Sequence, residues 1–391
     1  MINIAIGAVW LSTIVVAYVY VGYLLLLLIL TRWRRHDVRR ENITPAVTLL
    51  ISAFNEERII GKKLKNTLDL DYPNNRFEVI VVSDASTDGT DSIVEDFATA
   101  RSIRLLRMSK RQGKTTGLNA AVREARGEII VFSDANILYR KDVIRQLVRN
   151  FADPDVGCVT GNSCYAENLD SASHIQENNY WHYEQRIRAL ESELGSTVGG
   201  DGAIFAIRRG LYIPLQPDAI NDLVIPLQIV ARGYRANFES GAIGIEPSAG
   251  DFAAEFRRKR RIVNRSWRGV RSVPHVLDPR AVGIFAWQVW SHKVLRWLML
   301  PMILTAAVGC FIASPAGLIY RLGVCGFLAS VVIAGIGGLV KGSLGRLAGF
   351  AHGFFYFYMV NLAAFFGIIM AISGRVEVLW TPEREWNAPR R

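Results

Sequence analysis

The chain has few cysteines, four in 391 residues, and no two of them form a CxxC pair. The spacing of a zinc finger is therefore absent. Cys158 and Cys164 fall in the predicted soluble region, and Cys310 and Cys325 fall in apolar segments. We expect all four to be reduced packing residues, as is usual for a protein that faces the cytoplasm.

The chain has fewer acidic than basic residues: it contains 35 Asp and Glu and 46 Lys and Arg, which gives a net charge of +11. A basic balance is common in nucleic-acid-binding proteins, but this sequence has no recognition-helix pattern and no aromatic RNA-binding signature. Much of the positive charge lies instead in residues 32–40 and 257–271, next to apolar segments, where Lys and Arg meet anionic lipid headgroups. We therefore predict a lipid bilayer as a partner and exclude nucleic acid.

Charged side chains are absent from residues 4–30, a run long enough to cross a bilayer core of about 30 Å as a helix. A signal peptide would begin with basic residues and have a shorter apolar region. Here the arginines follow the run, so the positive-inside rule places the amino terminus outside and the chain after residue 31 in the cytoplasm. Residues 1–31 are predicted to form an amino-terminal transmembrane helix of a multi-pass protein in the inner (plasma) membrane.

Three more apolar segments, residues 298–313, 324–340 and 349–372, predict a carboxyl-terminal transmembrane region over 297–374, followed by a tail over 375–391. Four crossings that start outside would return the carboxyl terminus to the outside, and the basic tail opposes this orientation. Residues 251–296 alternate basic and aromatic side chains, including Trp267, which is typical of helices that lie in the membrane interface.

Residues 44–250 read as a soluble α/β domain. Buried-strand patterns at 46–53, 77–83, 103–108 and 129–132 alternate with helical patterns, and the connections are short. This order predicts a parallel, doubly wound sheet.

Gly113-Lys114-Thr115 resembles the end of a P-loop, which would indicate an ATPase. The first glycine of that motif would have to stand at position 108, which is Met108, and the order of elements is also wrong. An ATPase is therefore disfavoured.

Polar side chains follow the predicted strands at their carboxyl ends, where ligands bind in open α/β sheets. Asp134 ends the strand EIIVFSD, Asp84 follows the second strand, and Glu56 follows the first. Asp134 can hold a cation against phosphate oxygens or cap the next helix. Asp84 can bind a ligand or form an Asx turn. Asp222 lies at the start of a predicted helix, where it can either stabilise the helix dipole or act as a catalytic carboxylate.

The order LLISAFNEE, VIVVSDASTDGT, RQGK, IIVFSDAN, GGDGAIFAIRR and INDLVIPLQI resembles the membrane-bound family 2 glycosyltransferases. These are inverting enzymes of GT-A fold, a nucleotide-diphospho-sugar transferase fold, and they include chitin-oligosaccharide, hyaluronan and cellulose synthases. The resemblance extends over residues 47–268. One helix before this region and about three after it are similar to the same group.

The resemblance implies a UDP-sugar donor and a divalent cation, Mg²⁺ or Mn²⁺. Asp134 would be the first acid of the DxD motif that holds the cation, and Asn136 replaces the second acid. An amide oxygen is a weaker ligand than a carboxylate for such a cation. The other donor-binding residues would be Ala53, Glu56, Asp84, Lys114 and Arg261.

On the acceptor side, the resemblance implies that Asp222 is the general base, with Asp201, Gly202 and Trp267 nearby. Relatives that elongate polymers carry QxxRW in the interface helix. Residues 257–262 have neither Gln nor Trp in register, and Arg265 with Trp267 is mis-spaced. The sequence therefore predicts addition of one sugar or a few.

The function predicted is inverting transfer of a sugar from a UDP-sugar to a hydroxyl group of a saccharide or lipid-linked acceptor, in exopolysaccharide, oligosaccharide or glycolipid synthesis. Polysaccharide export proteins are further candidate partners. The alternative is a catalytically inactive relative that serves as a membrane scaffold in a polysaccharide secretion complex. Asn136, the Asn221 next to Asp222, and the missing QxxRW motif motivate that alternative.

Overall fold

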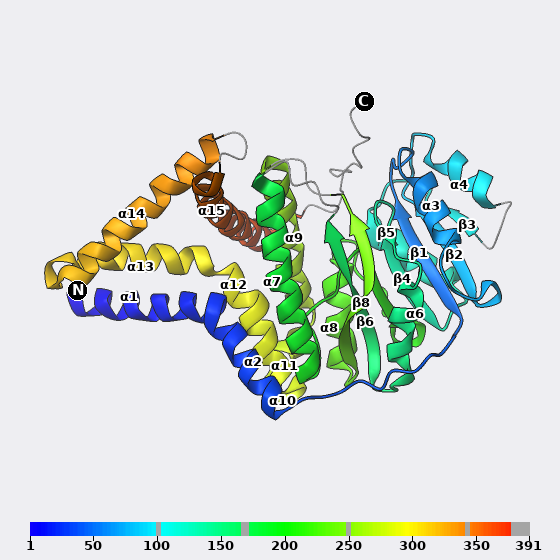
Figure 1. Ribbon diagram of the computed structural model, residues 1–391, viewed down its shortest axis with the longest axis horizontal. Coiled ribbons are helices and arrows are strands. Elements are labelled where there is room, and N and C mark those ends of the chain that lie inside the picture. Colours follow the sequence, from blue (N-terminus) through cyan, green and yellow to red (C-terminus); the bar gives the residue numbers. More distant parts are fainter. Residues whose placement is uncertain (99–102, 166–171, 248–251, 341–344, 377–391) are drawn as a thin grey trace.

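The computed structural model describes residues 1–98, 103–165, 172–247, 252–340 and 345–376. An α/β domain forms one end of the molecule and the apolar helices form the other, with α7 and α9 between them (Figure 1). The predicted boundary at 250/251 and residues 377–391 of the predicted tail lie outside the described residues.

One eight-stranded sheet forms the centre of the α/β domain, in the order β3-β2-β1-β4-β7-β6-β8-β5. The strands are β1 Val47–Ala53, β2 Phe77–Ser83, β3 Ile103–Arg107, β4 Ile129–Asp134, β5 Leu138–Tyr139, β6 Val156–Tyr165, β7 Ile204–Arg208 and β8 Arg235–Glu246. Strands β1 to β4 are parallel, as predicted.

The prediction of a parallel sheet throughout is wrong for the other half. Strand β7 runs antiparallel to both β4 and β6, and β5 runs antiparallel to β8, so the sheet is mixed. The chain reaches β7 through the long helix α7 and a glycine-rich loop, and this connection returns it along β4 in the opposite direction.

Helices cover both faces of the sheet. They are α3 Ile60–Leu68, α4 Thr90–Ala98, α5 Lys114–Glu124, α6 Val143–Val148, α7 Ala172–Leu194, α8 Asn221–Ala231 and α9 Phe252–Ser272. Every residue of β1 is buried, with Leu49 and Ile51 in one hydrophobic cluster and Leu50 in the other. This alternation is expected of a strand with two covered faces.

Helix α3 begins at Ile60, several residues after the end of β1. Residues 54–57 form a loop, because Asn55 adopts a positive φ of 54° and turns the chain away. The Asn55 side chain accepts a hydrogen bond of 2.9 Å from the backbone N–H of Thr87, and Glu57 Oε2 accepts one of 2.8 Å from Gly89 N–H. The loops after β1 and β2 are therefore joined at the sheet edge.

Within the described ranges, four helices are long and apolar enough to cross a membrane: Ile2–Trp33, Met299–Ala316, Leu318–Leu339 and Ala348–Ile372. The first combines α1 Ile2–Ala17, a π-helical turn η1 Tyr18–Gly22, and α2 Tyr23–Trp33; the last three correspond to α13 Met299–Ala313, α14 Leu318–Leu339 and α15 Gly345–Ile372. One such helix before the domain and three after it agree with the prediction.

Short helices connect the domain to α13. They are α10 Pro279–Val282, α11 Ile284–Val289, the π-helical turn η6 Trp290–Val294 and α12 Leu295–Trp297.

The basic segment predicted as an interfacial helix is α9, and α15 packs along it. The rings of Phe252 and His352 lie 6.3 Å apart near the start of both helices. Further along, Asn264 Nδ2 donates to the carbonyls of Gly367 at 3.3 Å and Arg375 at 3.0 Å. Helix α9 is therefore held between α15 and the α/β domain.

Candidate functional site

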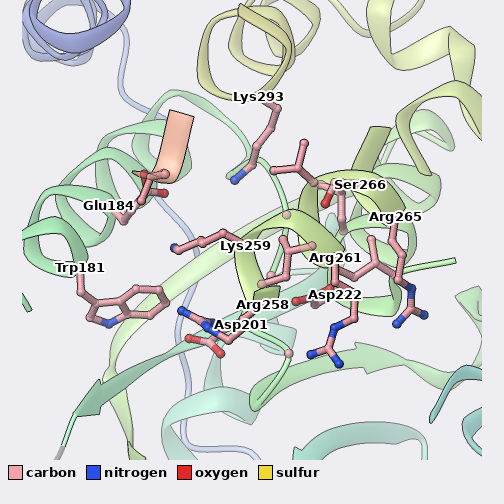
Figure 2. A pocket seen from close by; sticks show the side chains of 18 of the residues that line it. Trp181, Glu184, Asp201, Asp222, Arg258, Lys259, Arg261, Arg265, Ser266 and Lys293 are labelled. Carbon is pink, nitrogen blue, oxygen red and sulfur yellow. The ribbon is translucent and has the colours of Figure 1, made fainter. Parts of the chain in front are cut away.

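A cavity of about 710 Å³ lies at the carboxyl ends of β1 and β4 and extends to the apolar helices. Its walls come from the end of β4, the GGDG loop before β7, the start of α8, α7, α9, η6, α12 and α15. Figure 2 shows Asp222 and Arg261 close together, and Lys293 pointing into the cavity from the opposite side. The predicted residues that line this cavity are Glu56, Lys114, Asp134, Asn136, Asp201, Gly202, Asp222 and Arg261.

Asp134 and Lys114 form an ion pair at the sheet edge. Asp134 is the last residue of β4, and Lys114 is the first residue of α5. Lys114 Nζ lies 2.5 Å from Asp134 Oδ1 and 3.1 Å from the carbonyl oxygen of Gly202. This ammonium therefore joins the central strand to the loop that precedes β7. Asp134 takes part in no helix cap, because the strand continues up to it.

Asp84 supports the loop before α5. Its two carboxylate oxygens accept hydrogen bonds of 2.8 Å from the backbone N–H groups of Gln112 and Gly113. Gly113 has a φ of 88°, which favours glycine, and it places Lys114 at the start of the helix. Asp84 is buried beneath this loop and is not among the residues that line the cavity, and its contact with the donor stays a prediction.

Asp222 has the geometry of a base. It lies in the first turn of α8, and its Oδ1 is buried without a hydrogen-bond partner among the described residues. Burial raises the pKa of Asp222, and Asp201 adds to this effect, while the Lys114 ammonium opposes it. A half-buried carboxylate whose enclosed Oδ1 is vacant and whose pKa is raised is suited to accept a proton.

The glycine loop allows Asp222 to come this close. A Cβ atom on Gly202 would lie 2.9 Å from Asp222 Oδ2. The backbone N–H of Gly200 donates to the Asp222 carbonyl at 2.6 Å. The glycines therefore fix the loop against the start of α8.

Asp201 is engaged within the protein. Its Oδ2 accepts a hydrogen bond of 2.6 Å from Ser163 Oγ, and its Oδ1 accepts one of 3.2 Å from the backbone N–H of Ala203. The guanidinium of Arg188 lies 3.8 Å away. Asp201 is thus a less available base than Asp222.

Two other predicted residues lie outside the cavity lining. Ala53 ends β1 and is 2% exposed, and its carbonyl accepts a hydrogen bond from the backbone of Asp84 at 3.0 Å. Trp267 packs against Trp297, with ring centroids 6.2 Å apart. Trp297, not Trp267, is the tryptophan of this pair that lines the cavity.

The sequence reasoning missed a charged group next to the apolar helices. Glu184 and Arg188 of α7, His292 and Lys293 of η6, and Arg296 of α12 all line the cavity. His292 Nε2 lies 3.0 Å from Glu184, His292 Nδ1 lies 2.8 Å from Glu191, and Arg296 pairs with Glu184. The sequence signal is HKVLR within an apolar stretch, because ionisable residues there are usually functional.

The electrostatics of this group favour ionised carboxylates. Burial acts to raise the pKa of Glu184, but Arg296 and His292 more than offset it, and the net pKa is well below its usual range. Glu184 is therefore a fixed negative charge paired with neighbouring cations.

The helix α9 contributes its cations to the cavity. Arg258, Lys259, Arg261 and Arg265 all line it. These half-buried side chains therefore face the cavity, and the contact of the wider basic segment with lipid headgroups stays a prediction.

Within the described residues, no three His, Cys, Asp or Glu side chains converge as a preformed metal site. Asp134 nevertheless suits a cation: its side chain is 37% exposed, its Oδ1 already pairs with an ammonium, and Asn136 lines the same cavity. Mg²⁺-type ions are commonly bound by one or two carboxylates together with substrate phosphates. Asp134 and Asn136 therefore fit an ion that a diphosphate would share.

Residues 48–214 match the family model "Glycosyl transferase family 2". This match confirms the resemblance inferred from the motifs.

Two curated proteins that are similar to this chain are named as synthases. Over 166 residues the chain is 31% identical to a beta-monoglucosyldiacylglycerol synthase from Nostoc sp., which covers 40% of this chain and 36% of that protein. It is 24% identical over 198 residues to a poly-beta-1,6-N-acetyl-D-glucosamine synthase from Staphylococcus aureus, covering 49% and 48% of the two chains. The match thus spans less than half the length of these relatives.

A solved structure matches nearly the whole chain. It is a mannosyltransferase from Pyrobaculum calidifontis in complex with GDP-Man and Mn²⁺. The TM-score is 0.71 at 25% identity, and the match covers 93% of this chain and 99% of that one. The predicted GT-A fold is therefore confirmed.

Proposed function

Because residues 48–214 form a family 2 glycosyltransferase domain, we propose that this membrane protein transfers a sugar from a nucleotide diphosphate sugar to a hydroxyl group, with inversion. The observation that carries the proposal is the unpartnered, buried Oδ1 of Asp222 in the same cavity as Asp134 and Lys114. Asp222 as the base, and Asp134 with Lys114 as the side chains next to the donor phosphates, then line the same cavity.

The chemistry needs one displacement. The acceptor oxygen forms a bond to the anomeric carbon while the bond from that carbon to the diphosphate breaks, and Asp222 accepts the hydroxyl proton. The electron pair leaves with the nucleoside diphosphate, whose charge Lys114 and Arg261 stabilise. A single step from the opposite face inverts the anomeric configuration, and no covalent enzyme intermediate is required.

Asp134 and Asn136 would hold Mg²⁺ or Mn²⁺ against the donor phosphates. When bound, the ion supplies further neutralisation of the leaving diphosphate. The Mn²⁺ complex of the similar mannosyltransferase supports this assignment. Lys114 already donates to Asp134, so the carboxylate is held at the edge where the diphosphate would lie.

The residues of the site restrict the identity of the donor nucleotide and of the acceptor less than they restrict the type of reaction. The motifs imply a UDP-sugar, whereas the similar mannosyltransferase holds GDP-Man. The relatives support a glycolipid or polysaccharide product. We expect the catalytic domain to face the cytoplasm at the inner membrane, because arginines follow the first apolar helix.

The test uses the purified full-length protein with a panel of UDP-sugars and GDP-sugars, with Mn²⁺ or with EDTA. We expect nucleotide diphosphate release from one donor, and loss of release in EDTA. Asp134→Ala should weaken Mn²⁺-dependent donor binding by about tenfold or more, since a charge-assisted contact is lost. Asp155→Ala, which removes an exposed carboxylate, is the control. If no donor is bound or consumed, the inactive-scaffold alternative holds.

A further inference from the structure

The end of the cavity next to the apolar helices has a different lining from the end at the sheet. Tyr20 of η1 contributes there, with Tyr356, Phe357, Val360 and Ala364 of α15. These side chains come from two helices that are apolar enough to lie in a membrane. The cavity therefore connects the sheet edge with surfaces that a lipid tail can contact.

Charged groups stand where these two ends meet, and most of them are paired. Arg296 pairs with Glu184, while Arg258 and Lys259 lie 2.7 and 3.6 Å from Glu255. Lys293 lines the cavity and forms no hydrogen bond or ion pair with any described residue.

Arg188 adds a second under-compensated cation. It is 7% exposed, and its Nε and Nη1 atoms have no hydrogen-bond partner among the described residues. Its nearest carboxylate, Asp201 at 3.8 Å, is already held by Ser163. Burial lowers the pKa of Lys293, attraction to Glu184 and Glu191 opposes this effect, and repulsion from Arg188 and Arg296 adds to it. The buried guanidinium of Arg188 and the half-buried ammonium of Lys293 therefore form a positive group that an anion would stabilise.

We propose that Lys293 and Arg188 bind the phosphate of a lipid acceptor, whose neighbouring hydroxyl group is presented to Asp222. This inference rests on the proposed function, in which Asp222 acts as the base. A neutral hydroxyl group needs such a base to become a nucleophile, whereas an ionised phosphate oxygen does not. The phosphate is thus the group by which the lipid is held, and the hydroxyl group is the nucleophile. The tails would lie along the α15 side chains that line the cavity.

A lipid source for the phosphate is favoured over a soluble one by the lining. A soluble phosphate ester would not cover the apolar side chains of Phe357 and Val360 that line the cavity, whereas acyl or prenyl chains would cover them. A neutral polysaccharide acceptor would present neither an anion to Lys293 and Arg188 nor an apolar chain to the α15 side chains. Charge and apolar surface together therefore select a phospholipid-type acceptor.

The test compares lipids that differ only in phosphate. Phosphatidic acid and diacylglycerol with identical chains are added to the full-length protein in detergent, and binding is measured by native mass spectrometry. We expect phosphatidic acid to bind at least about tenfold more tightly, since charge-assisted hydrogen bonds contribute this much. Lys293→Met should abolish the preference. Arg271→Met, which removes an exposed cation of the same basic region, should retain it.

Other outcomes overturn the proposal. Equal binding of the two lipids, or a preference that survives Lys293→Met, would show that the cations do not hold a lipid phosphate. Glycerol 3-phosphate that competes as tightly as phosphatidic acid would show that the anion is soluble. Donor-dependent nucleotide release is measured on the same samples. Donor-dependent release by the wild-type protein, without any preference for phosphatidic acid over diacylglycerol, would reject this inference and leave the proposed function standing.

Discussion

At the scale of single residues, the proposed role of Asp222 as the base can be tested by one substitution. Asp222→Asn keeps the size and polarity of the side chain, so we expect donor affinity near that of the wild type. The amide cannot accept a proton, so transfer should fall by about 10²-fold or more. Transfer within a few-fold of the wild type would place the base elsewhere.

The pH dependence of transfer follows from the same residue. Because burial raises the pKa of Asp222, the carboxylate takes up a proton at a higher pH than an ordinary Asp. The rate of transfer should therefore fall as the pH decreases through this raised pKa, and it should be flat above it. The measurement is a pH profile of the turnover number, with donor saturating. An acid limb in the ordinary range of Asp would contradict the assignment.

Lys63 gives a stability prediction. It is fully buried in α3, with Nζ 3.7 Å from the centre of the Tyr139 ring, and burial lowers its pKa to about 7. The unfolded chain keeps its proton up to the ordinary value of 10.5, so unfolding takes up a proton between these two values. The free energy of unfolding should therefore rise with pH across this window.

Lys63→Met removes the buried amine and should stabilise the protein most at or below neutral pH, with a gain that shrinks toward about pH 9. Thermal melting in detergent at both pH values measures this. Lys65→Met, an exposed lysine of the same helix, is the control and should show little change. A gain of equal size at both pH values would mean that Lys63 is destabilising for a reason other than its charge.

At the scale of elements, the contact between α9 and α15 holds the basic helix against the cavity. A Cβ atom on Gly367 would lie 2.7 Å from the carbonyl oxygen of Arg260 and 3.0 Å from the backbone nitrogen of Asn264. A Cβ atom on Gly349, earlier in α15, would meet nothing within 4 Å. The two glycines therefore form a matched pair.

Gly367→Ala and Gly349→Ala both gain about 1 kcal/mol of helix propensity. Only Gly367→Ala forces α15 away from α9, so its melting temperature should fall and its transfer rate should decrease, because Arg258 and Arg261 move with α9. Gly349→Ala should melt at or above the wild-type temperature. Equal effects of the two substitutions would show that the helices are not tightly packed.

The sequence predicted those elements whose hydrophobic pattern is regular. Strand β2 has the predicted bounds, and the acids after β1, β2 and β4 fall at one sheet edge, because parallel strands present their carboxyl ends together. Strands β6 and β8 were not recognised, since residues such as Gly161, Asn162 and Gly241 interrupt their alternation.

The cation cluster could not be predicted, because it depends on contacts distant in sequence. Arg188 and Lys293 are separated by more than a hundred positions and meet only when α7 packs beside η6. Likewise, the hydrogen bonds that occupy both oxygens of Asp84 depend on the position of the next loop. Local patterns predict which side chains are polar, but packing decides which of them face the cavity.

At the scale of the whole molecule, the path of the last helix sets the side of the membrane on which the chain continues. Helix α15 is long and apolar enough to cross, yet it contacts α9 both near its start, at His352, and near its end, at Gly367. Helix α9 is too basic to enter the hydrocarbon core. A helix that runs along it cannot cross either, so α15 should lie at the interface (Figure 1).

We therefore expect the described part of the chain to cross three times, through Ile2–Trp33, α13 and α14, with Arg375 on the side of the catalytic domain. This replaces the expectation of a carboxyl terminus on the outside, and it agrees with the basic residues of the tail. A green fluorescent protein fused after Val376 should fluoresce in cells, whereas alkaline phosphatase fused there should be inactive. Fusions in the turn between α13 and α14, at Pro315, should show the opposite pattern. Active phosphatase after Val376 would mean that α15 crosses the bilayer and that its packing along α9 is not kept in the membrane.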